Sequence, residues 1–130
     1  RYGNAGRIIV FRLDGGPVPL PPEVDWDANL PALPARPQLS VAARKRGEQL
    51  FEKHCATWCH QVDDEPGGYP NLLRMHPARH AIFREIVLGG AFESRGMASF
   101  ADVLSEEDAR AILDYLIVTA HEMRARKGQL

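Results

Sequence analysis

The sequence predicts an all-α domain that is preceded by an extended strand and a proline-rich linker. Apolar residues recur at helical spacing in two stretches, near residues 47–54 and at residues 112–123. Proline is unevenly distributed, because seven of the ten prolines fall within residues 17–39. We therefore expect a strand-containing tail at residues 1–16, a linker at 17–39 and a folded domain at 40–130.

Composition limits the functions that this chain can have. Its 130 residues, 45% hydrophobic and 25% charged, suit one small globular domain with an extension. A formal net charge of −1 gives no bulk attraction to nucleic acid or to an anionic membrane surface. No apolar run approaches the roughly 18 residues needed to cross a bilayer. We expect no nucleic-acid partner and no membrane span.

The N-terminal third of the sequence predicts extended chain. Residues 7–13 are rich in β-branched and aromatic side chains and end at Asp14-Gly15-Gly16, which predicts one strand. This strand has no partner in the sequence, so it pairs with absent structure or lies on the following domain. Proline removes backbone donors and fixes φ, so the linker should have polyproline character.

The first helix of the folded domain should begin after Ser40, a good N-cap residue, and run to about His54. Glycine weakens a helix, so its presence on the apolar face indicates close approach by another helix. The apolar face comprises Gly47, Leu50, Phe51 and His54.

Two further helices are expected. One should start near Pro77, a residue favoured in the first turn, and stop at Gly89-Gly90. Its inward face comprises Ile82, Phe83, Ile86 and Val87. The last helix should open at Ser105, with acidic residues 106–108 in a first turn that suits the helix dipole. Its buried face comprises Ile112, Tyr115, Leu116, Thr119 and Met123.

Two cysteines and a histidine form the most informative motif: Cys55, Cys59 and His60. Each sulfur can add to a porphyrin vinyl group while the imidazole ligates iron, so the motif indicates covalent attachment of haem. The spacing is Cys-x-x-x-Cys-His, one residue longer than usual. A disulfide between the cysteines is an alternative, although it leaves His60 unexplained. A zinc site that adds His54 is another, but adjacent residues project in different directions.

Met97 is the strongest candidate for the second axial ligand, because it lies in a loop that can reach the opposite haem face. A His/Met pair saturates the iron and raises its potential, which suits electron transfer. His76 and His80 remain alternatives, whereas packing or surface roles are expected for Met75, Met123 and His121.

From about residue 40 to 123 the chain resembles a class I c-type cytochrome. The resemblance is carried by Gly47-Glu48-Gln49-Leu50-Phe51, by Cys55 to His60, by Gly96-Met97 with Phe100, and by Leu104-Ser105-Glu106-Glu107 before Tyr115. It implies the class I cytochrome c fold, in which the first and last helices cross closely at Gly47 and Tyr115. It also implies that His60 donates a hydrogen bond to the carbonyl of Pro70. The family's Met-Pro pair is Met-Ala here.

A narrower resemblance covers the whole chain. Gly3 to Gly16, the proline-rich linker and Ile86 to Gly90 before Gly96-Met97 are together similar to the C-terminal part of periplasmic quinohaemoprotein alcohol dehydrogenases. These enzymes join a β-propeller that carries pyrroloquinoline quinone (PQQ) to a cytochrome domain. The resemblance implies that residues 1–16 are the tail of such a propeller and that the protein is periplasmic in a bacterium.

The same resemblance implies an electron carrier with covalently attached haem c. It would accept single electrons from a PQQ-dependent dehydrogenase domain and pass them to a small redox protein or a quinone pool. Residues that bind PQQ or oxidise substrate are not among these 130 positions, so PQQ belongs to an absent parent domain and no catalytic residue is expected. The alternatives are a free-standing small cytochrome and a haem sensor or peroxidatic domain, which would need an open sixth position.

Overall fold

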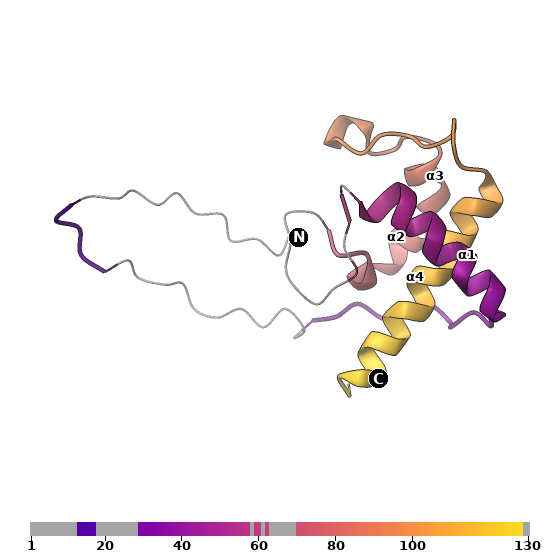
Figure 1. Ribbon diagram of the computed structural model, residues 1–130, viewed down its shortest axis with the longest axis horizontal. Helices are drawn as coiled ribbons and strands as arrows, with labels where there is room; N and C mark the ends of the chain where they lie inside the picture. Colours follow the sequence, from indigo (N-terminus) through magenta and orange to yellow (C-terminus); the bar gives the residue numbers. More distant parts are fainter. Residues whose placement is uncertain (1–12, 18–28, 58, 61, 63–69, 129–130) are drawn as a thin grey trace.

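The computed structural model describes residues 13–17, 29–57, 59–60, 62 and 70–128. In this part of the chain all regular structure is helical, and no strand occurs. The long helices α1 and α4 cross, with the short helices α2 and α3 beside them (Figure 1). The predicted cytochrome-like helical fold is thereby confirmed, whereas the strand at 7–13 lies outside the described residues except for Leu13.

Helix α1 spans Val41–Phe51 and begins where the sequence predicts. The Ser40 hydroxyl accepts a hydrogen bond from the Ala43 amide at 3.1 Å, which satisfies one of the free donors of the first turn. The helix continues into a π-helical turn, η1, at Glu52–Ala56. This turn follows directly on the C-terminal end of α1 and contains Cys55.

The crossing of α1 with α4 (Glu106–Arg126) depends on Gly47. A Cβ atom at Gly47 would lie 2.7 Å from the Cβ of Tyr115 and closer still to the carbonyl oxygen of Ala111. One turn further on, the rings of Phe51 and Tyr115 pack against each other at an angle of 39°, with centroids 5.9 Å apart. Any larger residue at 47 would therefore push the two helices apart.

The middle of the domain differs from the sequence prediction. The expected single helix is two short ones, α2 (Pro77–Ala81) and α3 (Phe83–Val87), separated at Ile82, whose φ of −112° and ψ of 23° are not helical. Short helices gain little from their own hydrogen bonds, so packing sets their direction. Phe83, Ile86 and Val87 are buried as predicted, but Ile82 is 37% exposed.

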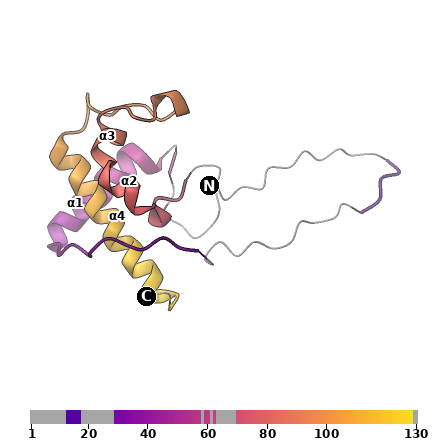
Figure 2. The same ribbon diagram turned by 180° about the vertical axis from the view of Figure 1, so that it is seen from behind.

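Helix α4 begins with a capping box. Asp108 N–H donates to the Ser105 hydroxyl and Ser105 N–H donates to the Asp108 carboxylate, each at 3.1 Å. The predicted face of α4 is buried, apart from half-buried Thr119, and Ile117, Val118 and Ala120 are buried as well. Residues on more than one side of α4 are buried because α1, α3 and the 3₁₀ turn η2 (Leu72–Arg74) all pack against it (Figure 2).

Residues 30–39 of the predicted linker contain no helix or strand and lie against α4. Leu33 packs on the hydrophobic core. The carbonyl of Pro34 lies 2.9 Å from Nε2 of His121, and Arg36 forms an ion pair with Glu122 at 3.0 Å. The last part of the linker thus belongs to the surface of the helical domain.

None of the helices described is long and apolar enough to span a membrane.

Candidate haem-attachment site

The backbone at the cysteine motif forms wide turns that take up its extra residue. The π-helical turn η1 contains Cys55, and the His60 amide donates to the Cys55 carbonyl at 2.9 Å, a bond between residues i and i+5. A π-type turn holds one residue more than an α-helical turn. The Thr57 hydroxyl also donates to the Glu52 carbonyl at 2.8 Å. The longer spacing is therefore compatible with a folded attachment loop.

Both thiols are free in the structure. Cys55 is half-buried and Cys59 is exposed, and no disulfide joins them. Burial raises the pKa of the Cys55 thiol to about 11, and the nearby Cys59 adds to the rise. Among the residues that the structure describes, no three histidines, cysteines or acids gather closely enough to hold a metal ion. The disulfide and zinc alternatives find no support in this geometry.

His60 is buried, with 9% of its surface exposed, and its ring is oriented by one contact. Its Nδ1 lies 3.1 Å from the carbonyl oxygen of Pro70. With Nδ1–H donating to this carbonyl, Nε2 keeps its lone pair for a metal. Burial lowers the pKa of His60, partly opposed by the bond to Pro70, so the ring stays neutral. The expected contact is present, and the role of both residues at a haem stays a prediction.

Met97 is half-buried and packs against the hydrophobic core cluster. Its loop runs between α3 and α4 and includes the 3₁₀ turn η3 (Glu93–Arg95). Met75 also packs against the core from a half-buried position, whereas Met123 is 2% exposed, in keeping with the packing role expected for it.

The alternative distal ligands have other environments. His76 is exposed and caps α2, with its Nδ1 accepting from the Ala78 amide at 3.2 Å. His80 is half-buried, and burial, followed by the charge of His76, lowers its pKa. Within the described part its Nδ1 is buried without a hydrogen-bond partner. His80 is therefore the less exposed of the two histidine alternatives, and a ligand role for either stays a prediction.

Several apolar side chains pack against the core while remaining only partly buried. They include Val62, Leu72 and Leu88, which were not predicted from the sequence as pocket residues, together with Leu50, Ala56 and Phe100. No periodicity marked Val62 and Leu72, because they lie outside regular helices. Two free thiols, an imidazole held by one carbonyl and a thioether are the kinds of group that attach and ligate a haem, and apolar side chains suit its surroundings. That these residues hold a haem together stays a prediction.

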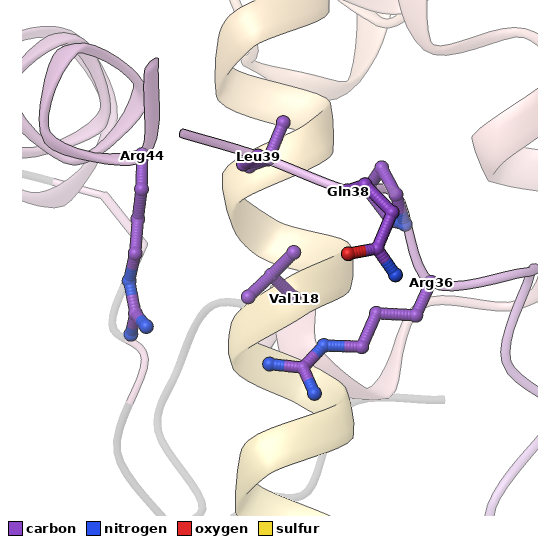
Figure 3. A pocket seen from close by; sticks show the side chains of 6 residues that line it. Arg36, Gln38, Leu39, Arg44 and Val118 are labelled. Carbon is purple, nitrogen blue, oxygen red and sulfur yellow. The ribbon is translucent and has the colours of Figure 1, made fainter. Parts of the chain in front are cut away.

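An open pocket lies elsewhere on the domain, where the linker meets α1 and α4 (Figure 3). The side chains of Arg36, Gln38 and Arg44 line it, with Val118 of α4 at its base. Both arginines bind Glu122, Arg36 at 3.0 Å and Arg44 at 2.7 Å. This pocket contains none of the candidate haem residues, so it is not the haem site.

Known proteins resemble the chain at three levels. A family model described as "Cytochrome C oxidase, cbb3-type, subunit III" matches residues 42–116. Quinohemoprotein alcohol dehydrogenase ADH IIB of Pseudomonas putida is 32% identical over 120 residues, which cover 92% of this chain and 17% of that protein. Quinohemoprotein alcohol dehydrogenase ADH-IIG of the same organism is 35% identical over 120 residues, covering 90% of the chain and 16% of the relative.

The resemblance extends to the fold. A solved structure of quinohemoprotein alcohol dehydrogenase ADHIIG from Pseudomonas putida HK5 matches with a TM-score of 0.62 and 32% identity, covering 83% of this chain and 16% of that one. The chain therefore spans less than a fifth of the length of the curated relatives it matches.

Proposed function

The chain belongs to the cytochrome c family described as cytochrome c oxidase, cbb3-type, subunit III, and we propose that it is the cytochrome domain of a PQQ-dependent alcohol dehydrogenase. It is related to the electron-transfer cytochrome domains of quinohemoprotein alcohol dehydrogenases, so electron transfer is its function. We further propose which residues bind its haem, which domain donates its electrons and which class of acceptor receives them.

The extent of the sequence matches carries this proposal. The family model begins at residue 42, but the matches to the two Pseudomonas putida dehydrogenases run over 120 residues. A match of that length does not fit within residues 40–130 and must include part of the N-terminal extension. A free-standing cytochrome would have no reason to share this extension with dehydrogenases. The match therefore supports a fused domain over a free-standing one.

In this proposal Cys55 and Cys59 attach haem c through thioethers, and His60 ligates its iron through Nε2. The group, when bound, supplies a one-electron couple. Pro70 fixes the ring of His60, because its carbonyl lies 3.1 Å from Nδ1. The neutral state of the buried imidazole suits ligation, since a protonated ring cannot bind metal.

Met97 is the proposed sixth ligand. Its thioether is a soft, neutral donor, and its half-buried position on the core limits access of water. With both axial positions filled, the domain moves electrons and binds small ligands only weakly. This arrangement argues against the sensor or peroxidatic alternative.

The proposed electron donor is a PQQ-dependent dehydrogenase domain that precedes this one, and the acceptor is a small redox protein or a quinone pool. The names of several bacterial relatives, which include quinohemoprotein alcohol dehydrogenases and an alcohol dehydrogenase (quinone), support this class of donor. A periplasmic location follows from the same proposal. Tethering by the linker raises the effective concentration of the donor at the haem edge.

A mass measurement combined with a visible spectrum tests the attachment. The denatured chain should retain the mass of one haem, and the reduced protein should show the spectrum of a low-spin c-type cytochrome. Substituting Cys55 or Cys59 by alanine should leave one thioether and shift the spectrum accordingly. A denatured chain without haem mass would overturn the proposal.

Exogenous ligands and a quinone enzyme test the function. The reduced protein should bind carbon monoxide only weakly at neutral pH, and it should accept electrons from a separately supplied PQQ-dependent alcohol dehydrogenase. Ready binding of carbon monoxide or cyanide by the wild type would favour the sensor or peroxidatic reading instead.

A further inference from the structure

The loop that carries Met97 is held without the proline that follows methionine in related cytochromes. Ala98 stands after Met97 and is exposed. An alanine leaves φ free, so it does not stiffen the backbone as proline does. A thioether ligand depends on its loop for position, because sulfur makes only weak hydrogen bonds. Something else must fix the backbone at residue 97.

The end of α3 supplies two acceptors for this loop. The last carbonyls of a helix have no partner within the helix. The amide of Phe100 donates to the carbonyl of Val87 at 2.9 Å, and the Ser99 hydroxyl donates to the carbonyl of Leu88 at 2.6 Å. Two successive loop residues thus bind two successive carbonyls of the helix end.

The Ser99 hydroxyl also accepts a hydrogen bond from the Ala101 amide at 3.3 Å. A hydroxyl has one proton to donate and lone pairs to accept, and here it uses both capacities. An alanine at this position would leave the part-buried carbonyl of Leu88 without this partner.

On the other side of Met97 the chain is fixed by its own turn. The Met97 amide donates to the carbonyl of Phe92 at 3.2 Å, and Gly96 has a φ of +87°, which favours glycine. The guanidinium groups of Arg79, in α2, and of Arg95 lie over the ring of Phe92, 4.8 Å and 5.1 Å from its centroid. The chain before Met97 is therefore held to α2 through Phe92, and the chain after it is held to the end of α3 through Ser99 and Phe100.

We propose that Ser99 is a positioning residue, whose hydroxyl clamps the loop to the end of α3 and holds Met97 where it can ligate the haem iron. This inference rests on the proposed ligation by Met97. Before Met97, the contact of Arg79 with Phe92 holds the loop. After Met97, the hydrogen bond from Ser99 restricts the backbone, as the proline after methionine does in related cytochromes.

The test uses the purified full chain with its haem and three variants. Ser99→Ala removes the clamp, and Ser99→Thr keeps a hydroxyl. Ser94→Ala is the matched control, because Ser94 is an exposed serine of η3 in the same loop. The readouts are the methionine-to-iron absorption band of the oxidised protein as a function of pH, the affinity of the reduced protein for carbon monoxide, and hydrogen exchange of amides 97–101.

In Ser99→Ala the band should disappear at lower pH than in the wild type, and carbon monoxide affinity should rise about fivefold, as expected for one lost hydrogen bond. Amides 97–101 should exchange faster. Ser99→Thr should restore the band and the affinity, and Ser94→Ala should match the wild type.

The possible failures are distinct. If the wild type shows the band, Met97→Ala lacks it, and Ser99→Ala is indistinguishable from the wild type, the positioning role is overturned while the proposed function stands. If the wild type lacks the band, ligation by Met97 fails, and this inference fails with it. Faster exchange in Ser99→Ala with an unchanged band and affinity overturns the inference, because the clamp would then order the loop without acting on the ligand.

Discussion

His60 and Met97, the two proposed axial ligands, are held in different ways. His60 is buried, and its own ring is fixed by the carbonyl of Pro70 at 3.1 Å. It also follows Cys59 directly, so covalent attachment would anchor the backbone beside it. In the part of the chain that the structure describes, no hydrogen bond fixes the sulfur of Met97, whose position depends on backbone and side-chain hydrogen bonds made by residues 92–101.

The difference predicts that the two sides respond differently to mutation. On the His60 side, the ligand directly follows a covalent anchor, Cys59, and the carbonyl of Pro70 orients its ring. On the Met97 side, the sulfur is the proposed ligand, and hydrogen bonds of the surrounding loop hold the backbone that positions it. Loss of the first ligand should therefore prevent a haem protein from forming, whereas loss of the second should change the properties of one that forms.

The largest effect is expected for His60→Ala. Without this imidazole the iron has no ligand beside the attachment cysteines, so the chain should accumulate with little or no bound haem. Haem content per chain, from the mass of the denatured protein and its visible spectrum, measures the effect. His54→Ala, in the same turn before Cys55, should retain haem; full haem content in His60→Ala would contradict the assignment.

Replacing Met97 by alanine should have the next largest effect. Haem should stay attached, while the sixth position opens, the reduction potential falls and carbon monoxide binds. Potentiometric titration and ligand-binding spectra measure these changes. Met75→Ala is the control, because Met75 is another half-buried methionine on the core. Unchanged spectra in Met97→Ala would direct attention to His80, whose Nδ1 is buried.

Local signals account for the parts of the structure that the sequence predicted. Ser40 and Ser105 cap helices through contacts within three residues, so their pattern is visible in the chain. Gly47 was notable because glycine is costly on an apolar helix face, and the structure shows its close contact with Ala111 and Tyr115.

The remaining features depend on tertiary contacts, which a single sequence does not show. The break at Ile82 follows from how α2 and α3 pack, and the contact of Pro34 with His121 joins segments far apart in the chain. The clamp by Ser99 likewise needs the end of α3 to lie beside the loop. The positions of Cys55, Cys59, His60 and Met97 could be proposed from sequence, but the contacts that orient them could not.

Deleting the N-terminal extension should lower the free energy of unfolding of the domain without changing its haem ligation. Removal of residues 1–39 should preserve the haem spectrum and reversible reduction, since none of the described hydrogen bonds or ion pairs joins residues 33–39 to His60 or Met97. It removes the packing of Leu33, the Pro34–His121 contact and the Arg36–Glu122 ion pair. We expect a loss of about 2 kcal/mol in the free energy of unfolding, from one partly buried apolar side chain and one hydrogen bond.

Removal of residues 1–28 is the matched control, because it leaves all three contacts in place. Thermal unfolding compares the two truncations, and docking to a separately supplied quinone domain should weaken in both. Loss of haem ligation in the longer truncation would show that the extension belongs to the haem core.

The smallest effect is expected at the capping box where the loop of Met97 joins α4. The ion pair with Arg46 at 2.8 Å, followed by hydrogen bonds from Ser105, lowers the pKa of Asp108 to about 2, below its unfolded value of about 3.9. Its contribution to stability is therefore complete above the unfolded pKa and is lost as pH falls through the folded pKa. Asp108→Ala should cost about 1 kcal/mol at pH 7, and the difference from the wild type should shrink between pH 4 and pH 2. Denaturant unfolding at several pH values measures this difference, with Glu107→Ala as the control, an exposed acid in the same turn.

The methionine-to-iron band at neutral pH should persist in Asp108→Ala, because the bonds from Ser99 and Phe100 to the end of α3 are untouched. Loss of that band would mean that the start of α4, and not the clamp on α3, fixes the position of Met97.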